Sequence, residues 1–337
     1  MNPGMTSENT ESRPARIVLC GAGSLGRAFL RQLRDLKSEF QLVAVMTAHH
    51  GQCVDADGMD PSLALNLIES EGFDRALNHE LADIIETCSP DILVECIPQN
   101  IRSGDPALAY LRTALDKGMS VVSSNKSAIV LGYRDLLHRA SKTNSKLRFE
   151  ATVLDGFPLF SCVEQIKSSD IVSVRGVLNG TSSLVLESLQ FGSTRSRGLA
   201  RAQALGIAEA DSVLDIDGWD AAAKAALLAN VWMDGSLRVF DVNRSGCEGL
   251  KDEDLKDTIE QGNYRLVAQI TRGEDGHVKA SVAPTIIESG DELHSLRGAA
   301  GGVCIQTADG QKYAFIHGSP GLDSAADGLV RDCRAVA

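Results

Sequence analysis

One stretch near the N-terminus, RIVLCGAGSLGRAFLRQL at residues 16–33, constrains the fold of this chain more than any other. An apolar run typical of a strand leads through a glycine-rich turn into an amphipathic helix. Gly21, Gly23 and Gly26 give the turn the pattern G-x-G-x-x-G. In such a turn the first glycine permits a tight bend, the second lets the backbone approach a pyrophosphate, and the third allows close packing of the helix. This context predicts a dinucleotide-binding site with the diphosphate at the helix N-terminus.

Strands and helices alternate from this motif to about residue 149. Apolar runs typical of buried strands occur at FQLVAVMT, DILVECI and MSVVSS. Between the last two runs, GDPALAYLRTALDKG carries leucines at helical spacing between a Pro start and a Gly stop. The alternation predicts an α/β domain over residues 15–149, built on a Rossmann-type, doubly wound parallel sheet.

The pattern changes after residue 149. Strand-like stretches such as IVSVRGVLNG, YRLVAQITR and VKASVAP are longer and mix with helices. We expect these helices at about 182–190, 195–205 and 218–233. The mixture predicts a second domain of the α+β class over residues 150–317.

The two ends of the chain also carry local signals. Residues 318–337 predict a C-terminal helix with Asp323 as its N-cap. This helix is expected to return to the nucleotide-binding domain, because Leu329 and Val330 need an apolar surface to cover them. Residues 1–14 are polar and lack the apolar segment of a secretory signal, so a disordered tail is expected there.

Charge and composition narrow the classes of partner. The formal net charge of −12 and the aromatic content of 4% argue against nucleic acid and anionic membranes, which favour basic and aromatic surfaces. No apolar run approaches the roughly 20 residues of a membrane span. The eight cysteines include no pair closer than eight residues, which excludes a CxxC zinc or redox motif. We therefore expect a cytoplasmic protein in a reducing compartment, with a small molecule as its substrate.

The stretch EADSVLDIDGWDAAAK, residues 209–224, carries five carboxylates and ends on a single lysine. Its acidic half runs directly into an alanine-rich helix, on which Asp220 and Lys224 stand four residues apart on one face. Two interpretations are open. The stretch is either an exposed loop followed by a surface ion pair, or a site in which carboxylates surround one ammonium group.

Two further stretches each admit a functional and a purely structural interpretation. Lys126 in SSNKSAI follows an expected strand, and a lysine at the carboxyl edge of a parallel sheet points towards the crevice where ligands bind. A surface lysine that caps a loop fits the same position. Asn179, Gly180 and Thr181 form a strand-to-helix turn, which is either a donor-rich cradle for an anion or carboxylate, or a plain Asx/Gly turn.

The acidic residue that usually ends the second strand of an NAD-binding domain is missing. Thr47, Ala48, His49 and His50 occupy that region. Without a carboxylate at the ribose 2′-hydroxyl, a 2′-phosphate is not repelled, and either histidine could contact it. The sequence therefore favours NADP slightly over NAD and leaves both open.

Together and in this order, these residues resemble homoserine dehydrogenase over about residues 16–334. The resemblance rests on GAGSLGRAFL, GDPALAYLRTALDKGMSVVSSNK, LRFEATVLDGFP, GVLNGTSS, ALGIAEADSVLDIDGWDAAAKAALLAN and, more faintly, HGSPGLDSAADGLVRD. It implies reduction of L-aspartate 4-semialdehyde to L-homoserine with NADPH or NADH, a step towards threonine and methionine. It also implies a homodimer formed through the second domain, and a short form of the enzyme without a regulatory domain.

The resemblance implies roles for individual residues as well. Lys224 is the acid/base, Asp220 polarises or orients the reacting oxygen, and Lys126 lies beside the nicotinamide and that oxygen. The implied substrate contacts are Glu209 and Asp215, which bind the ammonium group, and the turn of Asn179, Gly180 and Thr181. The implied cofactor contacts are Gly21, Ala22, Gly23, Ser24, Leu25, Gly26, Ile97, Lys126 and Gly321.

A monovalent cation such as sodium is also implied, near the hinge between the domains. Its ligands would be the side chain of Glu150 and the backbone carbonyls of Val153, Asp155 and Phe157. A partly buried acid beside a turn is the plainer interpretation of Glu150. Two other functions remain open for the whole chain: a dehydrogenase of the same fold that acts on another short hydroxy acid or hydroxy amino acid, and a catalytically inactive NAD(P)-binding regulator.

Overall fold

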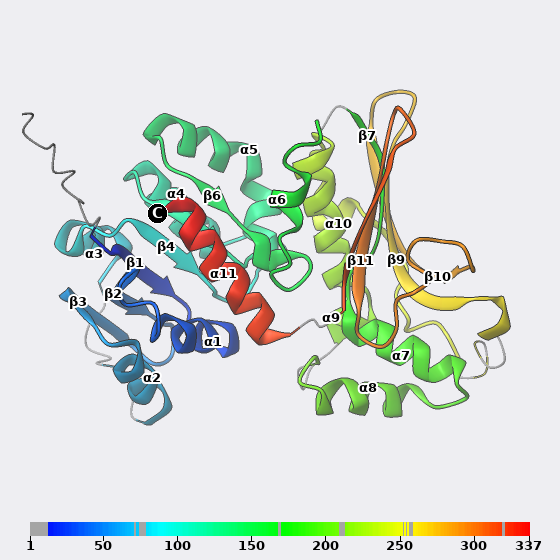
Figure 1. Cartoon of the computed structure of the whole chain (residues 1–337), viewed down its shortest axis with the longest axis horizontal. Helices are drawn as coiled ribbons and strands as arrows, with labels where there is room; N and C mark the ends of the chain where they lie inside the picture. Colours follow the sequence, from blue (N-terminus) through cyan, green and yellow to red (C-terminus); the bar gives the residue numbers. More distant parts are fainter. Residues whose placement is uncertain are drawn as a thin grey trace, which may run out of the picture.

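Two six-stranded sheets, one in each half of the chain, organise the computed structural model (Figure 1). The structure describes residues 13–70, 72–73, 79–167, 170–208, 213–251, 253, 255, 259–318 and 321–337. The tail expected at residues 1–14 lies outside this part of the chain, apart from Arg13 and Pro14.

The N-terminal sheet has the strand order β3-β2-β1-β4-β5-β6. Its strands are β1 (Ala15–Cys20), β2 (Phe40–Met46), β3 (Gln52–Met59), β4 (Ile92–Glu95), β5 (Ser120–Ser123) and β6 (Leu147–Arg148). Every neighbouring pair is parallel except β2 with β3. The strand order reverses between β1 and β4, and doubly wound sheets bind ligands at the carboxyl ends of the strands at such a point. The predicted Rossmann-type fold is confirmed.

One edge strand of this largely parallel sheet is antiparallel. A tight turn, in which both the backbone N–H and the hydroxyl of Thr47 donate to the carbonyl of Gly51, sends the chain back as β3, antiparallel to β2. The segment QCVDADGM did not predict a strand because two aspartates and a glycine interrupt its apolar residues, and all but the first of its residues are partly or fully exposed. Polar edge strands are common, since they discourage pairing with a second sheet.

Helices cover both faces of this sheet. Alternate residues of β1 face opposite ways, so that Ile17 and Leu19 belong to one core while Val18 and Cys20 belong to the other. The first core is completed by α1 (Ser24–Leu33), α2 (Pro61–Ser70) and α11 (Leu322–Val336). The second core is completed by α3 (Leu81–Cys88), α4 (Ala107–Asp116) and α5 (Lys126–Thr143).

The C-terminal helix α11 packs against α1 and buries Leu329 and Val330 (Figure 1). Its N-cap is Gly321, so the prediction of Asp323 as the N-cap is wrong. Asp323 lies in the first turn of the helix instead. A carboxylate there still interacts favourably with the positive end of the helix dipole, which explains why the residue signalled a helix start two positions too late.

The C-terminal half is built on the sheet β12-β11-β7-β9-β10-β8, in which only the β10–β8 pair is parallel. Its strands are β7 (Ile171–Val177), β8 (Asn243–Arg244), β9 (Asn263–Arg272), β10 (Val278–Ile287), β11 (Gly301–Thr307) and β12 (Lys312–His317). The accompanying helices are α6 (Leu159–Val163), α7 (Gly180–Gln190), α8 (Arg195–Ala204), α9 (Val213–Ile216) and α10 (Trp219–Trp232). α7 and α10 pack on the sheet, as an α+β domain requires.

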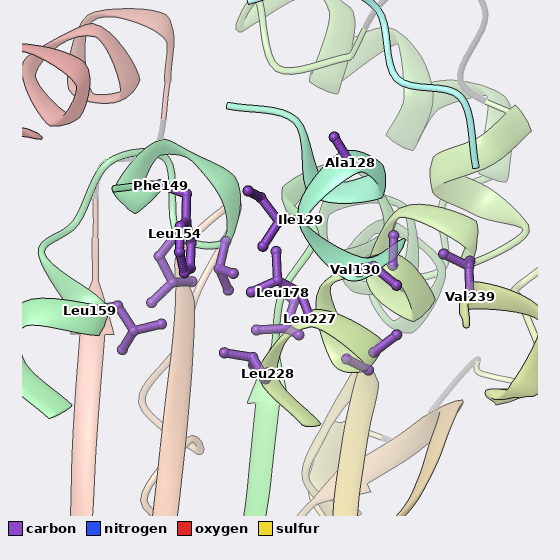
Figure 2. Close-up of a cluster of buried hydrophobic side chains, with 14 of the residues drawn as sticks. Ala128, Ile129, Val130, Phe149, Leu154, Leu159, Leu178, Leu227, Leu228 and Val239 are labelled. Carbon is purple, nitrogen blue, oxygen red and sulfur yellow. The ribbon is translucent and has the colours of Figure 1, made fainter. Parts of the chain in front are cut away.

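The two halves meet where α10 packs against α5. α10 is buried along nearly its whole length, because its many alanines let neighbouring elements approach closely. Figure 2 shows Ile129 and Val130 of α5 in one apolar cluster with Leu227 and Leu228 of α10 and with Leu178, which follows β7. We call this cluster the α5–α10 seam. It joins residues of both halves into a single core.

A cavity in the α5–α10 seam should be costly. Leu227→Ala removes a fully buried side chain, and we expect a loss of about 2–5 kcal/mol in the free energy of unfolding. The matched control is Leu137→Ala on α5, where the leucine is 42% exposed and the loss should stay within about 0.5 kcal/mol. Denaturant unfolding of both variants tests this, and equal losses would show that the seam is not a shared core.

Candidate active site

Three helices start close together at the junction of the two halves, and each brings a polar residue that the sequence singled out. Lys126 is the first residue of α5, and Asn179 is the N-cap of α7. Asp220 lies in the first turn of α10, with Lys224 one turn further along. Because α5 and α10 are held by the apolar seam, the charged ends of both helices converge on one place.

Asp220 bridges two lysines from different halves of the chain. Its Oδ2 lies 2.9 Å from Nζ of Lys224, and its Oδ1 lies 3.3 Å from Nζ of Lys126. The side chains of Lys224, Asp220 and Lys126 are only 9%, 13% and 18% exposed. The interpretation of Asp220 and Lys224 as a surface ion pair is therefore wrong. Lys126 is likewise no surface lysine.

Asp220 and the two lysines stabilise one another's charged forms. Burial works to raise the pKa of Asp220, but the positive charges of Lys224 and Lys126 outweigh it and hold that pKa well below its usual range. Burial works to lower the pKa of Lys224, but the carboxylates of Asp220, Asp155 and Asp215 raise it above its usual range. Asp220 is therefore a carboxylate and Lys224 an ammonium group at neutral pH.

The turn before α7 is joined to the acidic stretch. The side-chain amide of Asn179 donates to Oδ1 of Asp215 at 2.8 Å and to Oδ2 of Asp220 at 3.1 Å. Its Oδ1 accepts from the backbone N–H of Ser182 at 2.8 Å and so caps α7. Asn179 thus acts as an Asx cap and as part of the polar cluster, so its two interpretations do not exclude each other.

Asp215 and Lys224 complete this cluster. Nζ of Lys224 donates to the carbonyl of Leu178 at 2.6 Å, which ties α10 to the end of β7. Burial and the nearby charge of Asp220 raise the pKa of Asp215, whereas hydrogen bonds from Asn179 and Thr181 work against that rise. Glu209, the other predicted partner of the substrate ammonium group, lies outside the described residues.

A different steric environment explains each of the three glycines in the first turn. Gly21 has φ +96°, and a Cβ there would lie 2.6 Å from the backbone of Cys96, in the loop after β4. A Cβ on Gly26 would overlap the carbonyl of Gly21, so the third glycine is required by the turn itself. A Cβ on Gly23 would meet nothing within 4 Å. Protein packing therefore leaves room at Gly23, which is where a pyrophosphate needs it.

The remaining predicted cofactor contacts lie in turns or at the starts of helices. Ala22 is buried before the start of α1, and Ser24 and Leu25 are the first residues of that helix. The Gly23 N-cap of α1 offers no side-chain hydrogen bond, so the helix N-terminus keeps donors for an anion. Ile97 lies beyond the end of β4, and Gly321 begins α11 with open space at its α-carbon.

One buried polar group at this edge was missed by the sequence reasoning. Glu95, the last residue of β4, is 0% exposed and accepts hydrogen bonds from Ser123, Ile97 and Asn125. The signal was present, because a glutamate in the middle of the apolar run DILVECI is unusual for a buried strand. The apolar pattern of the run by itself predicts only a strand.

The residues predicted to hold a monovalent cation fit that role only in part. The carboxylate of Glu150 accepts from the backbone N–H groups of Phe160 and Ser161, at the start of α6, and from the Ser161 hydroxyl. The carbonyl of Phe157 accepts from Leu159 at 2.6 Å. Two of the four predicted ligands therefore already have protein partners, while the carbonyls of Val153 and Asp155 remain candidates.

Sequence profiles of known families match most of the chain. The profile of homoserine dehydrogenase matches residues 158–333, and the profile of the homoserine dehydrogenase NAD-binding domain matches residues 21–150. The chain belongs to the homoserine dehydrogenase family. The predicted family is thereby confirmed, and the protein is an NAD(P)-dependent oxidoreductase with homoserine dehydrogenase activity.

Named relatives and solved structures agree with this assignment. The NAD(+)-dependent homoserine dehydrogenase of Pseudomonas canavaninivorans is 30% identical over 303 residues, which is 86% of each chain. The homoserine dehydrogenase of Methanocaldococcus jannaschii is 31% identical over 272 residues, covering 76% of this chain and 81% of that one. The crystal structure of the Thermoplasma acidophilum enzyme superposes with a TM-score of 0.82 at 26% identity, covering 96% and 98% of the two chains.

Two kinds of feature were not found among the described residues. Within the described ranges, no group of three or more His, Cys, Asp or Glu side chains is arranged to hold a metal ion. No helix of the described chain is long and apolar enough to cross a membrane.

The open space at Gly23 yields a test of the cofactor site. Gly23→Val should leave the protein folded, because the backbone there has φ −70° and a Cβ would meet no protein atom within 4 Å, but it should weaken NADPH and NADH binding by at least about tenfold. The matched control is Gly249→Val, which also has open space around it and should bind normally. Fluorescence titration measures both, and normal cofactor affinity in a folded Gly23→Val protein would refute the predicted site.

Proposed function

We propose that the buried lysines and Asp220 are the catalytic centre of this homoserine dehydrogenase, with Lys224 as the acid/base. The observation that carries the proposal is Asp220, which binds one lysine from each half of the chain with its two carboxylate oxygens. A purely structural ion pair needs only one cation. Two ammonium groups held by one carboxylate can both donate to the same ligand oxygen.

The reaction interconverts L-aspartate 4-semialdehyde and L-homoserine. A nicotinamide bound in the dinucleotide site would supply or accept the hydride at the carbon of the reacting group. In the reducing direction the ammonium of Lys224 donates a proton to the substrate oxygen as negative charge develops there. The raised pKa of Lys224 suits this role, because the group carries its proton at neutral pH. In the reverse direction the neutral amine takes the proton from the hydroxyl group.

Asp220 and Lys126 support this transfer in different ways. Asp220 holds the ammonium of Lys224 on one oxygen and that of Lys126 on the other, so both point towards the same place. A second ammonium close to the developing oxyanion stabilises it electrostatically, an effect that contributes several kcal/mol in a site with little water.

We propose that the acidic residues and the turn before α7 bind the amino-acid end of the substrate. Asp215 is positioned by Asn179 and lies close to the lysine cluster. Its carboxylate, with that of Glu209, can pair with the ammonium group of homoserine. Gly180 and Thr181 begin α7, whose N-terminus presents donors that suit the substrate carboxylate.

The two other functions are less well supported. A substrate without an ammonium group would leave the acidic residues next to the site without a cation to bind. An inactive NAD(P)-binding regulator has no use for two buried ammonium groups, which cost free energy to desolvate.

The cofactor contacts and the cation remain parts of the proposal. We propose that the turn of Gly21, Ala22, Gly23, Ser24, Leu25 and Gly26 binds the pyrophosphate, with Ile97, Lys126 and Gly321 around the rest of the dinucleotide. The monovalent cation stays a prediction, and the hydrogen bonds that occupy Glu150 weigh against its side chain as a ligand.

We also propose a homodimer in the cytoplasm that serves threonine and methionine synthesis. The edge strand β12 exposes the large apolar side chains of Tyr313 and Ile316, which suit a contact with a second copy. All eight cysteines are free thiols, as expected in a reducing compartment.

The acid/base role of Lys224 is testable by steady-state kinetics with homoserine as the varied substrate. Lys224→Ala should lower kcat by about 100-fold or more, the scale of general acid catalysis, with cofactor affinity nearly unchanged. Lys142→Ala, on the exposed part of α5, is the control and should have normal kinetics. Glu209→Gln should instead mainly raise KM for homoserine. Turnover above about half of normal in Lys224→Ala would contradict the proton transfer.

Cofactor preference is a separate prediction. Ala48 is exposed just beyond the end of β2, so no carboxylate repels a 2′-phosphate there, and NADP should be used at least as well as NAD. One relative is described as NAD(+)-dependent, while an archaeal homoserine dehydrogenase structure, 26% identical over 96% of this chain and 97% of that one with a TM-score of 0.77, holds NADPH. Both nicotinamide cofactors thus occur among the relatives of this chain.

Ala48→Asp should shift the ratio of kcat/KM towards NAD by about tenfold or more, because like charges would then face each other at the ribose. Ala48→Asn has nearly the same shape without the charge, and it should leave the preference almost unchanged. A wild-type protein with a strong preference for NAD would show that another residue selects the cofactor.

A further inference from the structure

The buried carboxylate of Glu95 joins the two loops that carry proposed cofactor contacts on this side of the sheet. Its Oε1 accepts from the backbone N–H of Ile97 at 2.9 Å and from the side-chain amide of Asn125 at 3.3 Å. Its Oε2 accepts from the hydroxyl of Ser123 at 2.6 Å. One side chain at the end of β4 thus binds its own loop and the loop after β5.

These bonds continue directly to Lys126. The hydroxyl of Ser123 accepts from the backbone N–H of Asn125 at 3.0 Å, and Oδ1 of Asn125 caps α5 by accepting from Ala128 at 3.1 Å. The amide of Asn125 also reaches the carbonyl of Ile97 at 3.3 Å. Lys126 is the next residue and the first of α5. The direction in which α5 presents Lys126 therefore depends on Asn125, which Glu95 holds from both sides.

We propose that Glu95 is a positioning residue for the dehydrogenase reaction, which sets Ile97 against the cofactor and Lys126 against Asp220. It touches neither lysine nor Asp220 in the described structure, so it acts through Ser123 and Asn125. The inference rests on the proposed role of Lys126.

Burial of the Glu95 carboxyl group costs free energy of desolvation, which a residue with a purely structural role would not require. It is fully buried and has no ion-pair partner among the described residues, and burial raises its pKa to about 7. The titratable groups that interact with it are the thiols of Cys20 on β1 and of Cys96 in the following loop. Burial raises the pKa of both thiols far above neutrality, so both are uncharged. β5 and the start of α5 contribute only the hydroxyl and amide groups already named.

The sign of the pH effect on stability follows from the raised pKa. Between the ordinary value of 4.5 and about 7, the folded protein keeps a proton that the unfolded chain has lost. The contribution of Glu95 to stability is therefore present below this window and is lost as the pH rises through it. The hydrogen bonds from Ile97 and Asn125 change in the opposite sense, because they are stronger to the ionised carboxylate.

The test compares three variants with the wild-type enzyme by steady-state kinetics. Glu95→Ala removes all three bonds, and it should lower kcat by roughly 10- to 100-fold, the cost of a small displacement of a reacting group. It should also raise KM for NADPH by about tenfold, because buried donors lose their partner. KM for homoserine should stay nearly constant, since the proposed substrate contacts lie on the other half of the chain.

Glu95→Gln is the conservative rescue. Its carbonyl can accept from Ile97 and Asn125, and its amide can donate to Ser123, so kcat should return to within about threefold of the wild type. In the wild type, KM for NADPH should rise modestly as the pH falls from 8 to 6, and Glu95→Gln should lack that change. If Glu95→Ala does not fold, Ser123→Ala removes a single bond and should change kcat in the same direction to a smaller extent.

A structural role alone predicts different results. Ile84→Ala in α3 makes a cavity in the same domain and should lower thermal stability without changing KM for NADPH. A kcat defect in Glu95→Ala that Glu95→Gln does not rescue, or kinetics of Glu95→Ala and Ser123→Ala that match Ile84→Ala, would overturn the inference.

A double-mutant cycle separates this inference from the proposed function. If Glu95 acts through Lys126, Glu95→Ala should reduce kcat much less in a Lys126→Met background than in the wild type. Normal kinetics in Lys126→Met alone would refute the proposed role of Lys126. Impaired Lys126→Met with additive effects of Glu95→Ala would refute only the inference about Glu95.

Discussion

The packing of α5 against α10 is the contact on which the proposed active site depends. Both helices begin at the same end of the seam, and both carry their functional residues in the first turns. Apolar side chains such as Ile129 and Leu227 exclude water along the helices, so their relative position is determined by close packing rather than by flexible surface contacts (Figure 2). The distance from Asp220 to Lys126 is a consequence of that packing.

Each charged group at the end of the α5–α10 seam would destabilise the fold if it were buried alone, but the groups of opposite charge stabilise one another. A single buried ammonium or carboxylate would lose its hydration without compensation. Asp220 is compensated by Lys224 and Lys126, and Lys224 is compensated in turn by three carboxylates. Perturbed ionisable groups that depend on one another at a domain junction are typical of a site that handles charge during a reaction. Asp215, Asp220 and Lys224 of the acidic stretch therefore form one group of interacting charges, which supports the proposed role in the reaction.

The carboxyl edge of the N-terminal sheet carries the proposed dinucleotide site, next to this junction. The loops after β1 and β4 touch at Gly21 and Cys96, and the space left open at Gly23 lies at the same switch point. Glu95 then connects β4 to the loop after β5, which leads into Lys126. The two proposed halves of the site, one for the dinucleotide and one for the substrate, are thus linked by backbone and buried hydrogen bonds as well as by the seam.

Local sequence was sufficient for most elements and for the residue types of the site, because periodicity, caps and glycine patterns act within a few residues. The G-x-G-x-x-G turn, the strands around it and the one-face spacing of Asp220 and Lys224 are of this kind. It was insufficient for β3, which gains its partner only at the sheet edge, and for the start of α11, where Gly321 rather than Asp323 is the cap. Only the tertiary structure decided that Asp220 lies between two lysines and that Glu95 holds Asn125. Those contacts join residues that are far apart in the chain. They form only when folding brings the two partners together and removes water from both of them.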